Sequence, residues 1–247
     1  MSFTVTRFNS SKYLINIFLG WIQMNNKIML VIFLYALLAS NCTYSFAIYN
    51  NISKEAIGLL VSCDPKNNGE YCLLDYVLKP NNIIFDVGSN IGDYTRYVLS
   101  LNRDLKIYSF EPVFDVYQKM IKNLDKSICQ NVLTYNIGFY KQNIDMPIWY
   151  AYQNDGLSSI YDRDLNILYK KEDVNLRSMD DFCLENHIDF IDFLKIDTEG
   201  AEFDVLVGAN QLLSNKQIRY IQFEYGGTYL DAGFTLKQVF EPWLFCL

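Results

Sequence analysis

Residues 83–92 have the sequence IIFDVGSNIG, a mostly apolar run that leads into a turn with two glycines. The run, residues 83–87, has the length and composition of a β-strand that is buried on both faces, as the strands of parallel sheets are. Residues 93–100, which follow the turn, have helical periodicity. A strand, a glycine turn and a helix in this order are typical of an open α/β sheet that binds a ligand at the carboxyl ends of its strands.

Four further strand-like runs follow along the chain, and helical patterns separate them. Strands that alternate with helices predict an α/β fold, a mostly parallel sheet with helices on both faces. Residues 146–160 interrupt this pattern, and we expect a hairpin or a loop over the ligand end of the sheet. The expected strands are residues 105–110, 132–136, 192–196 and 218–223, and the expected helices are residues 113–124 and 202–213.

The composition excludes several classes of protein. Of the 247 residues, 51% are hydrophobic and 16% aromatic, which excludes a disordered or fibrous chain. The formal net charge of −7 argues against a nucleic acid partner. The six cysteines form no CxxC pair and the chain has a single histidine, so we expect no structural metal site.

An uninterrupted apolar run, IMLVIFLYALLA, occupies residues 28–39. It is shorter than the roughly 20 residues of a membrane-spanning helix. Read from Met24, the run and the small residues Ser45 and Ala47 follow the pattern of a secretory signal. The sequence thus predicts that residues 1–47 are an extension with a cleaved signal peptide or an uncleaved signal anchor. A buried helix is the third alternative.

This extension decides the expected location of the protein. A signal or anchor would contact a membrane or a translocon, and the rest of the chain would be exported or membrane-associated. If the segment is not functional, the protein is cytoplasmic. After the extension, residues 48–82 are expected to form a helical segment, with helices at 53–60 and 69–78, and residues 83–247 to form the α/β domain.

Glycines and acidic residues follow the first two expected strands. Gly88 and Gly92 allow the backbone to turn tightly and to approach a ligand. Asn90 stands where a dinucleotide-binding GxGxxG motif has its middle glycine, and Asp86 would repel a pyrophosphate but suits a cationic amino group. Glu111, about 20 residues further on, can accept hydrogen bonds from ribose hydroxyls. The order of these residues along the chain predicts a site for a nucleoside with a positively charged tail.

These motifs resemble those of the FkbM family of S-adenosylmethionine-dependent methyltransferases. The resemblance implies a Rossmann-like class I methyltransferase fold, S-adenosyl-L-methionine as cofactor, and methyl transfer to a hydroxyl of a sugar, glycolipid or other small-molecule acceptor. It covers about 140 residues and rests on residues 85–92, 110–112, 178–182, 191–202, 205–209 and 223–224.

The resemblance also implies roles for the residues of the glycine turn. Gly88, Asn90 and Gly92 would line the methionine end of the cofactor. Asp86 would approach the same end, and Glu111 would hold the ribose.

Methyl transfer requires that the acceptor oxygen is aligned with the methyl carbon and that the hydroxyl proton is removed. Asp197 and Glu199 follow the fourth expected strand, so either is a candidate base, or the pair holds a divalent cation that acidifies the hydroxyl. Asp197 is the preferred candidate, and its alternative role is to cap the helix that starts near Glu202. Glu224, at the end of the fifth strand, is a further candidate. His187 is expected at the surface, away from the ligand.

The C-terminal part of the sequence predicts an incomplete domain. Only 23 residues follow Glu224. Residues 235–245 can form the next helix of the fold, and the antiparallel hairpin expected after it is missing, so the sequence predicts a truncated domain with impaired activity.

One alternative to an active enzyme is a catalytically inactive, exported domain that binds a ligand. A nicotinamide-dependent oxidoreductase is disfavoured because the chain has no GxGxxG motif.

Overall fold

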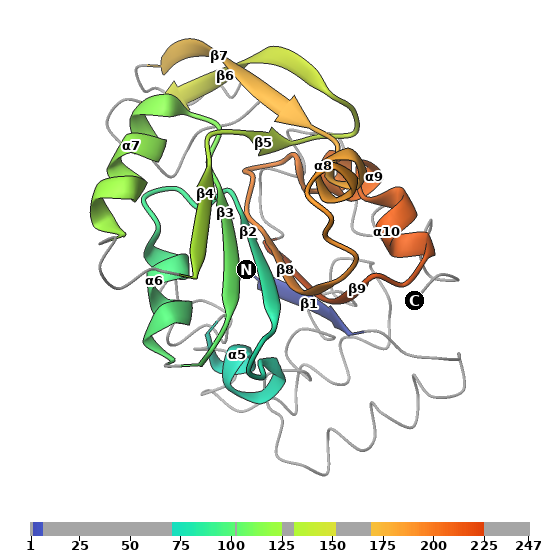
Figure 1. Cartoon of the computed structure of the whole chain (residues 1–247). Coiled ribbons are helices and arrows are strands. Elements are labelled where there is room, and N and C mark those ends of the chain that lie inside the picture. Colours follow the sequence, from blue (N-terminus) through green and yellow to red (C-terminus); the bar gives the residue numbers. More distant parts are fainter. Residues whose placement is uncertain (1, 7–70, 102, 125–130, 152–168, 225–247) are drawn as a thin grey trace, which may run out of the picture. The chain divides into compact units, whose positions relative to one another are not determined.

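The computed structural model describes residues 2–6, 71–101, 103–124, 131–151 and 169–224 (Figure 1). The chain divides into two compact units. In the first unit, helix α5 (Cys72–Val77) lies within the helix expected at residues 69–78. The helix expected at 53–60, the apolar run at 28–39 and all residues after Glu224 lie outside the described residues. Within the described ranges, no helix is long and apolar enough to cross a membrane.

The second unit, residues 4–6 and 78–247, carries a sheet with the order β1-β9-β8-β2-β3-β4, of whose strand β1 it contains residues 4–6. Five of these strands pair in parallel, which confirms the mostly parallel sheet. All five were expected from apolar runs, because strands covered on both faces have few polar positions. The strands are β1 (Ser2–Thr6), β2 (Ile83–Val87), β3 (Lys106–Phe110), β4 (Val132–Tyr135), β8 (Ile191–Ile196) and β9 (Ile218–Glu224).

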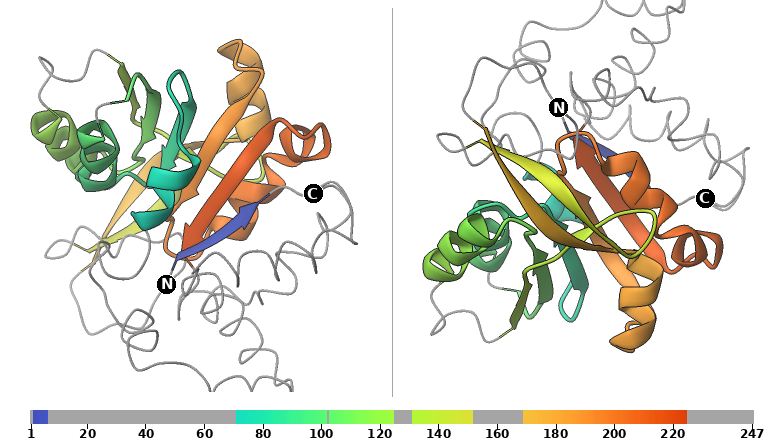
Figure 2. Two further views of the ribbon diagram at one scale, coloured as in Figure 1. Left: turned by 90° about the horizontal axis from the view of Figure 1, so that it is seen from below. Right: turned by 90° about the horizontal axis from the view of Figure 1, so that it is seen from above.

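Helices cover both faces of this sheet, as the sequence predicts (Figures 1 and 2). On one face, the Thr95 side chain of α6 forms a hydrogen bond with Asp86 of β2. The Tyr117 side chain of α7 forms one with Thr134 of β4 on the same face. On the other face, the Phe182 ring of α8 packs edge-on against Phe110 and Tyr135, with centroids 5.1 and 5.0 Å away. The helices are α6 (Asp93–Ser100), α7 (Phe114–Asn123), α8 (Met179–Glu185), α9 (Glu202–Val207) and α10 (Asn210–Ser214).

The motif at residues 178–182 has a structural role around α8. The Ser178 hydroxyl caps the helix by accepting from the Asp181 N–H at 3.1 Å. Asp180 accepts from the N–H groups of Gln211 and Leu212, at 2.8 and 3.0 Å, and so caps α10. The motif therefore joins two helices on one face of the sheet.

The prediction of a single helix at residues 202–213 is wrong, because the structure has two helices there, α9 and α10. Gly208 lies at the break. A Cβ atom at Gly208 would be 2.1 Å from the carbonyl oxygen of Tyr140, so this backbone packs directly against another segment. The break depends on a tertiary contact, and helical periodicity carries no signal of it.

A second, three-stranded sheet has the order β5-β7-β6, and β6 pairs antiparallel with β7. Residues 146–151 belong to β6, and residues 152–160 lie outside the described residues, so the choice between a hairpin and a loop for 146–160 stays a prediction. β7, which pairs with β6, was not expected. Ile91 of the glycine turn packs against the core that this sheet shares with α7, so the small sheet lies beside the ligand end. The strands are β5 (Gly138–Phe139), β6 (Ile144–Ala151) and β7 (Tyr169–Arg177).

Candidate active site

The glycine turn after β2 is held by backbone hydrogen bonds and by three left-handed residues. Gly88, Asn90 and Gly92 have φ angles of 79°, 49° and 86°. The N–H groups of Gly88 and Ser89 both donate to the carbonyl oxygen of Phe110, at 3.0 and 2.9 Å. The turn is therefore fixed against the end of β3.

Gly88 also brings the ends of β2 and β8 together. A Cβ atom at Gly88 would be 1.9 Å from the carbonyl oxygen of Asp197. The Asp197 N–H donates to the carbonyl oxygen of Val87 at 2.9 Å. Because no side chain fits at Gly88, this close approach places the Asp197 segment beside the glycine turn.

Gly88→Ala should destabilise the chain by about 4 kcal/mol or more, since its Cβ overlaps backbone in addition to the left-handed φ. Gly92→Ala is the matched control, because its φ is similar and its Cβ would meet only side chains of Met120 and Leu124, at 3.1 Å and beyond. We expect the control to cost about 1–2 kcal/mol. Urea unfolding measures both; equal losses would contradict the close contact.

Asp86 is buried near the end of β2, with 1% of the residue exposed. Its Oδ2 accepts a hydrogen bond from the Thr95 hydroxyl at 2.6 Å, whereas its Oδ1 has no hydrogen-bond partner. Burial raises the pKa of Asp86, and the nearby Lys195 ammonium acts in the opposite direction. A buried carboxylate oxygen without a donor is unfavourable, so this atom is suited to a ligand that donates to it.

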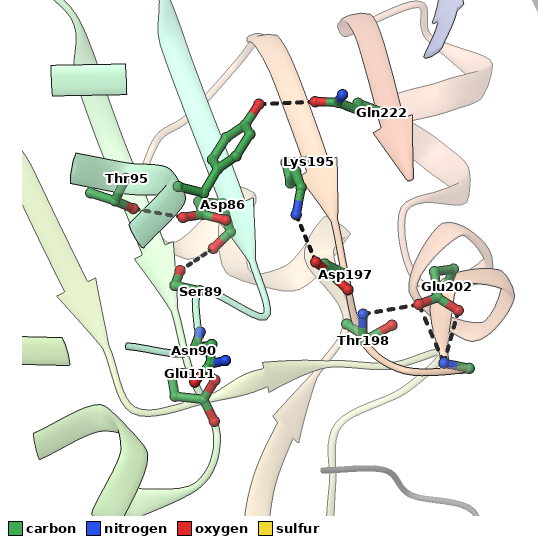
Figure 3. Close-up of polar contacts among 12 residues, drawn as sticks. Asp86, Ser89, Asn90, Thr95, Glu111, Lys195, Asp197, Thr198, Glu202 and Gln222 are labelled. Carbon is green, nitrogen blue, oxygen red and sulfur yellow. Dashed lines mark hydrogen bonds and ion pairs between the residues drawn. The ribbon is translucent and has the colours of Figure 1, made fainter. Parts of the chain in front are cut away.

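Two further buried polar atoms have no hydrogen-bond partner in the structure, Asn90 Oδ1 and Thr198 Oγ1. Asn90 belongs to the glycine turn and Thr198 follows β8, so both lie in the same region as Asp86 (Figure 3). Buried polar side chains are usually paired. Three unpaired atoms at the carboxyl ends of β2 and β8 therefore indicate a site for a polar ligand.

Glu111 fixes the glycine turn from the end of β3. Its residue exposure is 6%, and its two carboxylate oxygens accept from the N–H groups of Asn90 at 3.0 Å and Val113 at 2.9 Å. Each carboxylate oxygen of Glu111 thus accepts from a backbone N–H group. The structure thus brings Glu111 to the turn, and its ribose contact stays a prediction.

Asp197, the first residue after β8, forms an ion pair with Lys195 of the same strand. Lys195 Nζ lies 2.9 Å from Asp197 Oδ2, and the two side chains are 4% and 32% exposed. Lys195 has no expected role in the sequence analysis. The sequence signal for Lys195 was a lysine within an otherwise apolar strand. The charge of a lysine buried in a sheet that is covered on both faces needs a partner.

The remaining candidate residues lie in different places. Glu199 and Gly200 have positive φ angles, 53° and 115°. The backbone therefore leaves the extended conformation of β8 at Glu199. Glu224 is the last residue of β9, and its side chain lies outside the described set. His187 is exposed in the connection before β8, which confirms the expected surface position. Among the described residues, no group of three or more His, Cys, Asp or Glu side chains could hold a metal ion.

Glu202 is a buried acid that the sequence analysis treats only as a helix start. It is 1% exposed, and its carboxylate accepts from the N–H groups of Thr198 at 2.9 Å and Gly200 at 3.0 Å. Burial raises the pKa of Glu202 to about 7, although these hydrogen bonds act in the opposite direction. The Glu202 carboxylate therefore closes the turn that carries Thr198. With this pKa, Glu202 is protonated in a fraction of the molecules at neutral pH.

Glu202 should make the chain less stable as the pH rises from about 4.5 to about 7, because the folded state retains a proton that the unfolded chain releases. Glu202→Gln removes this effect. Its unfolding free energy relative to wild type should therefore increase by about 3 kcal/mol between pH 4.5 and 8. Urea unfolding across this range tests it, with the exposed Glu185→Gln as control. A difference that is constant with pH would contradict the assignment.

Comparison with known proteins identifies the family of this chain. The family model described as Methyltransferase FkbM domain matches residues 86–244, more than half of the chain. The 2-O-methyltransferase NoeI of Sinorhizobium fredii is 26% identical over 169 residues, 63% of this chain and 68% of NoeI. Methyltransferase sdnD of Sordaria araneosa is 27% identical over 162 residues, 54% of this chain and 62% of sdnD.

A third relative, Methyltransferase 1 of Beauveria bassiana, is 26% identical over 145 residues, 52% of this chain and 58% of the relative. The chain thus spans about three fifths to two thirds of the length of these relatives. The family match, the α/β sheet and the glycine turn confirm the resemblance seen in the sequence. This chain has a Rossmann-like methyltransferase fold and belongs to the FkbM family of methyltransferases.

Proposed function

We propose that this methyltransferase uses S-adenosyl-L-methionine and methylates a hydroxyl oxygen of a sugar, glycolipid or other small-molecule acceptor. The donor part rests on one observation, the unpaired buried atoms Asp86 Oδ1, Asn90 Oδ1 and Thr198 Oγ1. A ligand with an ammonium group and hydroxyls carries the donors that these atoms lack. The family supports a methyl donor, and NoeI, named a 2-O-methyltransferase, supports oxygen as the methylated atom.

Each residue of the turn has a proposed part in holding this donor. Asp86 would bind the ammonium group, since a buried carboxylate binds a cation more strongly than an exposed one does. Gly88, Asn90 and Gly92 would line the amino acid end, because their left-handed backbone shapes the turn at the end of β2. Glu111 would accept from the ribose hydroxyls while it fixes the turn.

S-adenosyl-L-methionine, when bound, supplies an electrophilic methyl group on a positively charged sulfur. The acceptor hydroxyl must lose its proton as its oxygen is methylated, and a carboxylate at the edge of the site can take it. Asp197 fits this task best, because it lies beside Gly88 and its side chain is 32% exposed. Asp86 and Glu202 are buried and out of reach of an acceptor.

Incubation of the full chain with methyl-labelled S-adenosyl-L-methionine and a panel of sugars and glycolipids tests this function. We expect label in a base-stable ether on one acceptor class. Binding of the donor product without label transfer to any hydroxyl would support the inactive binding domain instead. Label found in an amine or an ester would contradict hydroxyl methylation.

A further inference from the structure

A row of buried polar residues crosses the centre of the sheet. Ser109 of β3, Asp86 of β2, Lys195 of β8 and Gln222 of β9 are partners in register. Their exposures are 0%, 1%, 3% and 1%. Register partners on parallel strands lie on the same face, about 4.8 Å apart. A lysine is thus enclosed between two strands in a part of the sheet where apolar residues are usual.

The contacts of Lys195 hold its ammonium in one place (Figure 3). Its Nζ lies 2.9 Å from Asp197 Oδ2 and 4.8 Å from the centre of the Tyr94 ring. The Tyr94 hydroxyl donates to Gln222 Oε1 at 3.0 Å, which fixes the ring beneath the ammonium. A cation over an aromatic face is stabilised where little water is present. Lys195 is therefore built into the site from three elements, α6, β8 and β9.

Lys195 also connects the two acids that the proposed function uses. Its positive charge lowers the pKa of Asp86, whereas the negative charge of Asp197 raises it. Two carboxylates that interact in this way resist being ionised together unless a cation lies near both. Lys195 is that cation, because it is the register partner of Asp86 and the ion-pair partner of Asp197.

We propose that Lys195 is a positioning residue of the methyltransferase site. It holds the Asp197 carboxylate through Oδ2 and allows Asp86 and Asp197 to be ionised together, one for the donor and one for the acceptor proton. The proposal rests on the proposed function. Among the described residues, the charged or titratable groups that face this centre include Asp86 from β2, Asp197 after β8, Tyr94 from α6 and Glu202 from α9, which interacts with Asp197.

Lys195→Met tests the role in turnover. At pH 7 its kcat should fall about 10-fold or more, and the acid limb of its pH profile should move up by about one unit or more, because a tenfold change corresponds to one unit. Lys195→Arg keeps the charge and should keep the wild-type pH profile even if its larger head lowers kcat. Lys106→Met is the control, since Lys106 is exposed and its ammonium lies 5.0 Å from the Tyr108 ring, outside the site.

A second measurement separates this proposal from the proposed function. In the ligand-free full chain, carboxyl-carbon NMR should show that Lys195→Met raises the pKa of Asp86 above its wild-type value. If Lys195→Met does not fold, Lys195→Gln, which keeps a hydrogen-bond donor without the charge, should give the same change. An Asp86 titration that equals wild type overturns the proposal, whether or not the chain transfers methyl groups. A changed titration without any methyl transfer supports the coupling by Lys195 and counts against the proposed function alone.

Discussion

Asp86→Asn should weaken the binding of S-adenosylhomocysteine by about 100-fold, the upper end of what a hydrogen bond to a charged group contributes. The ligand carries the same ammonium group as the methyl donor. In the free chain Asp86 Oδ1 is buried and unpaired, so the ligand's N–H groups would complete its hydrogen bonds. Asparagine keeps the shape and an acceptor for Thr95 but removes the negative charge. Calorimetric titration of the full chain gives the two dissociation constants.

The affinity of the wild type should also rise with pH, since burial raises the pKa of Asp86 and the ammonium group binds the ionised form. This pH dependence should be absent in Asp86→Asn. Asp192→Asn is the matched control at the other end of the sheet, where Asp192 accepts from the Ile83 N–H at 2.9 Å and pairs with Arg219. The control should lose stability and keep the affinity. An equal loss of affinity in both variants would contradict the role of Asp86.

Asp197→Asn should lower kcat by about 100-fold or more and change the affinity for S-adenosylhomocysteine little, because a positioned general base contributes about 10²–10⁴-fold. The amide still accepts a hydrogen bond from Lys195, so the variant should fold. Single-turnover transfer of a labelled methyl group measures the chemical step. The calorimetric titration in parallel measures binding.

Glu199→Gln separates the two acids of the turn after β8. If Glu199 is the base, this variant should lose the turnover and Asp197→Asn should retain it. If Asp197→Asn loses affinity as strongly as Asp86→Asn, Asp197 belongs to the donor site and its assignment as base is wrong.

The parallel sheet was predictable because its strands are covered on both faces. The segment from Ile83 to Val87 was expected with the bounds it has in the structure, since its apolar run ends at a glycine. β7 was not expected, because Val174 and Leu176 are the only buried apolar residues among its described side chains and most of its other positions are charged or polar. A strand with so few apolar positions carries a weak alternating signal.

The arrangement of the glycine turn beside Glu111 was also predictable, whereas the contacts of Lys195 and Glu202 were not. Asp86 lies near the end of β2, and Asn90 and Glu111 follow β2 and β3, so the three come together because the carboxyl ends of parallel strands share one edge. The roles of Lys195 and Glu202 depend on strand register and on burial at a turn. Neither property can be read from local sequence.

The central claim is that the glycine turn and the end of β8 bind a methyl donor, and one titration tests it most directly. Calorimetric titration of the folded full chain with S-adenosylhomocysteine should show one site with a dissociation constant of about micromolar order, corresponding to about −8 kcal/mol. A folded sample that shows no binding at millimolar concentrations of this ligand would contradict the account.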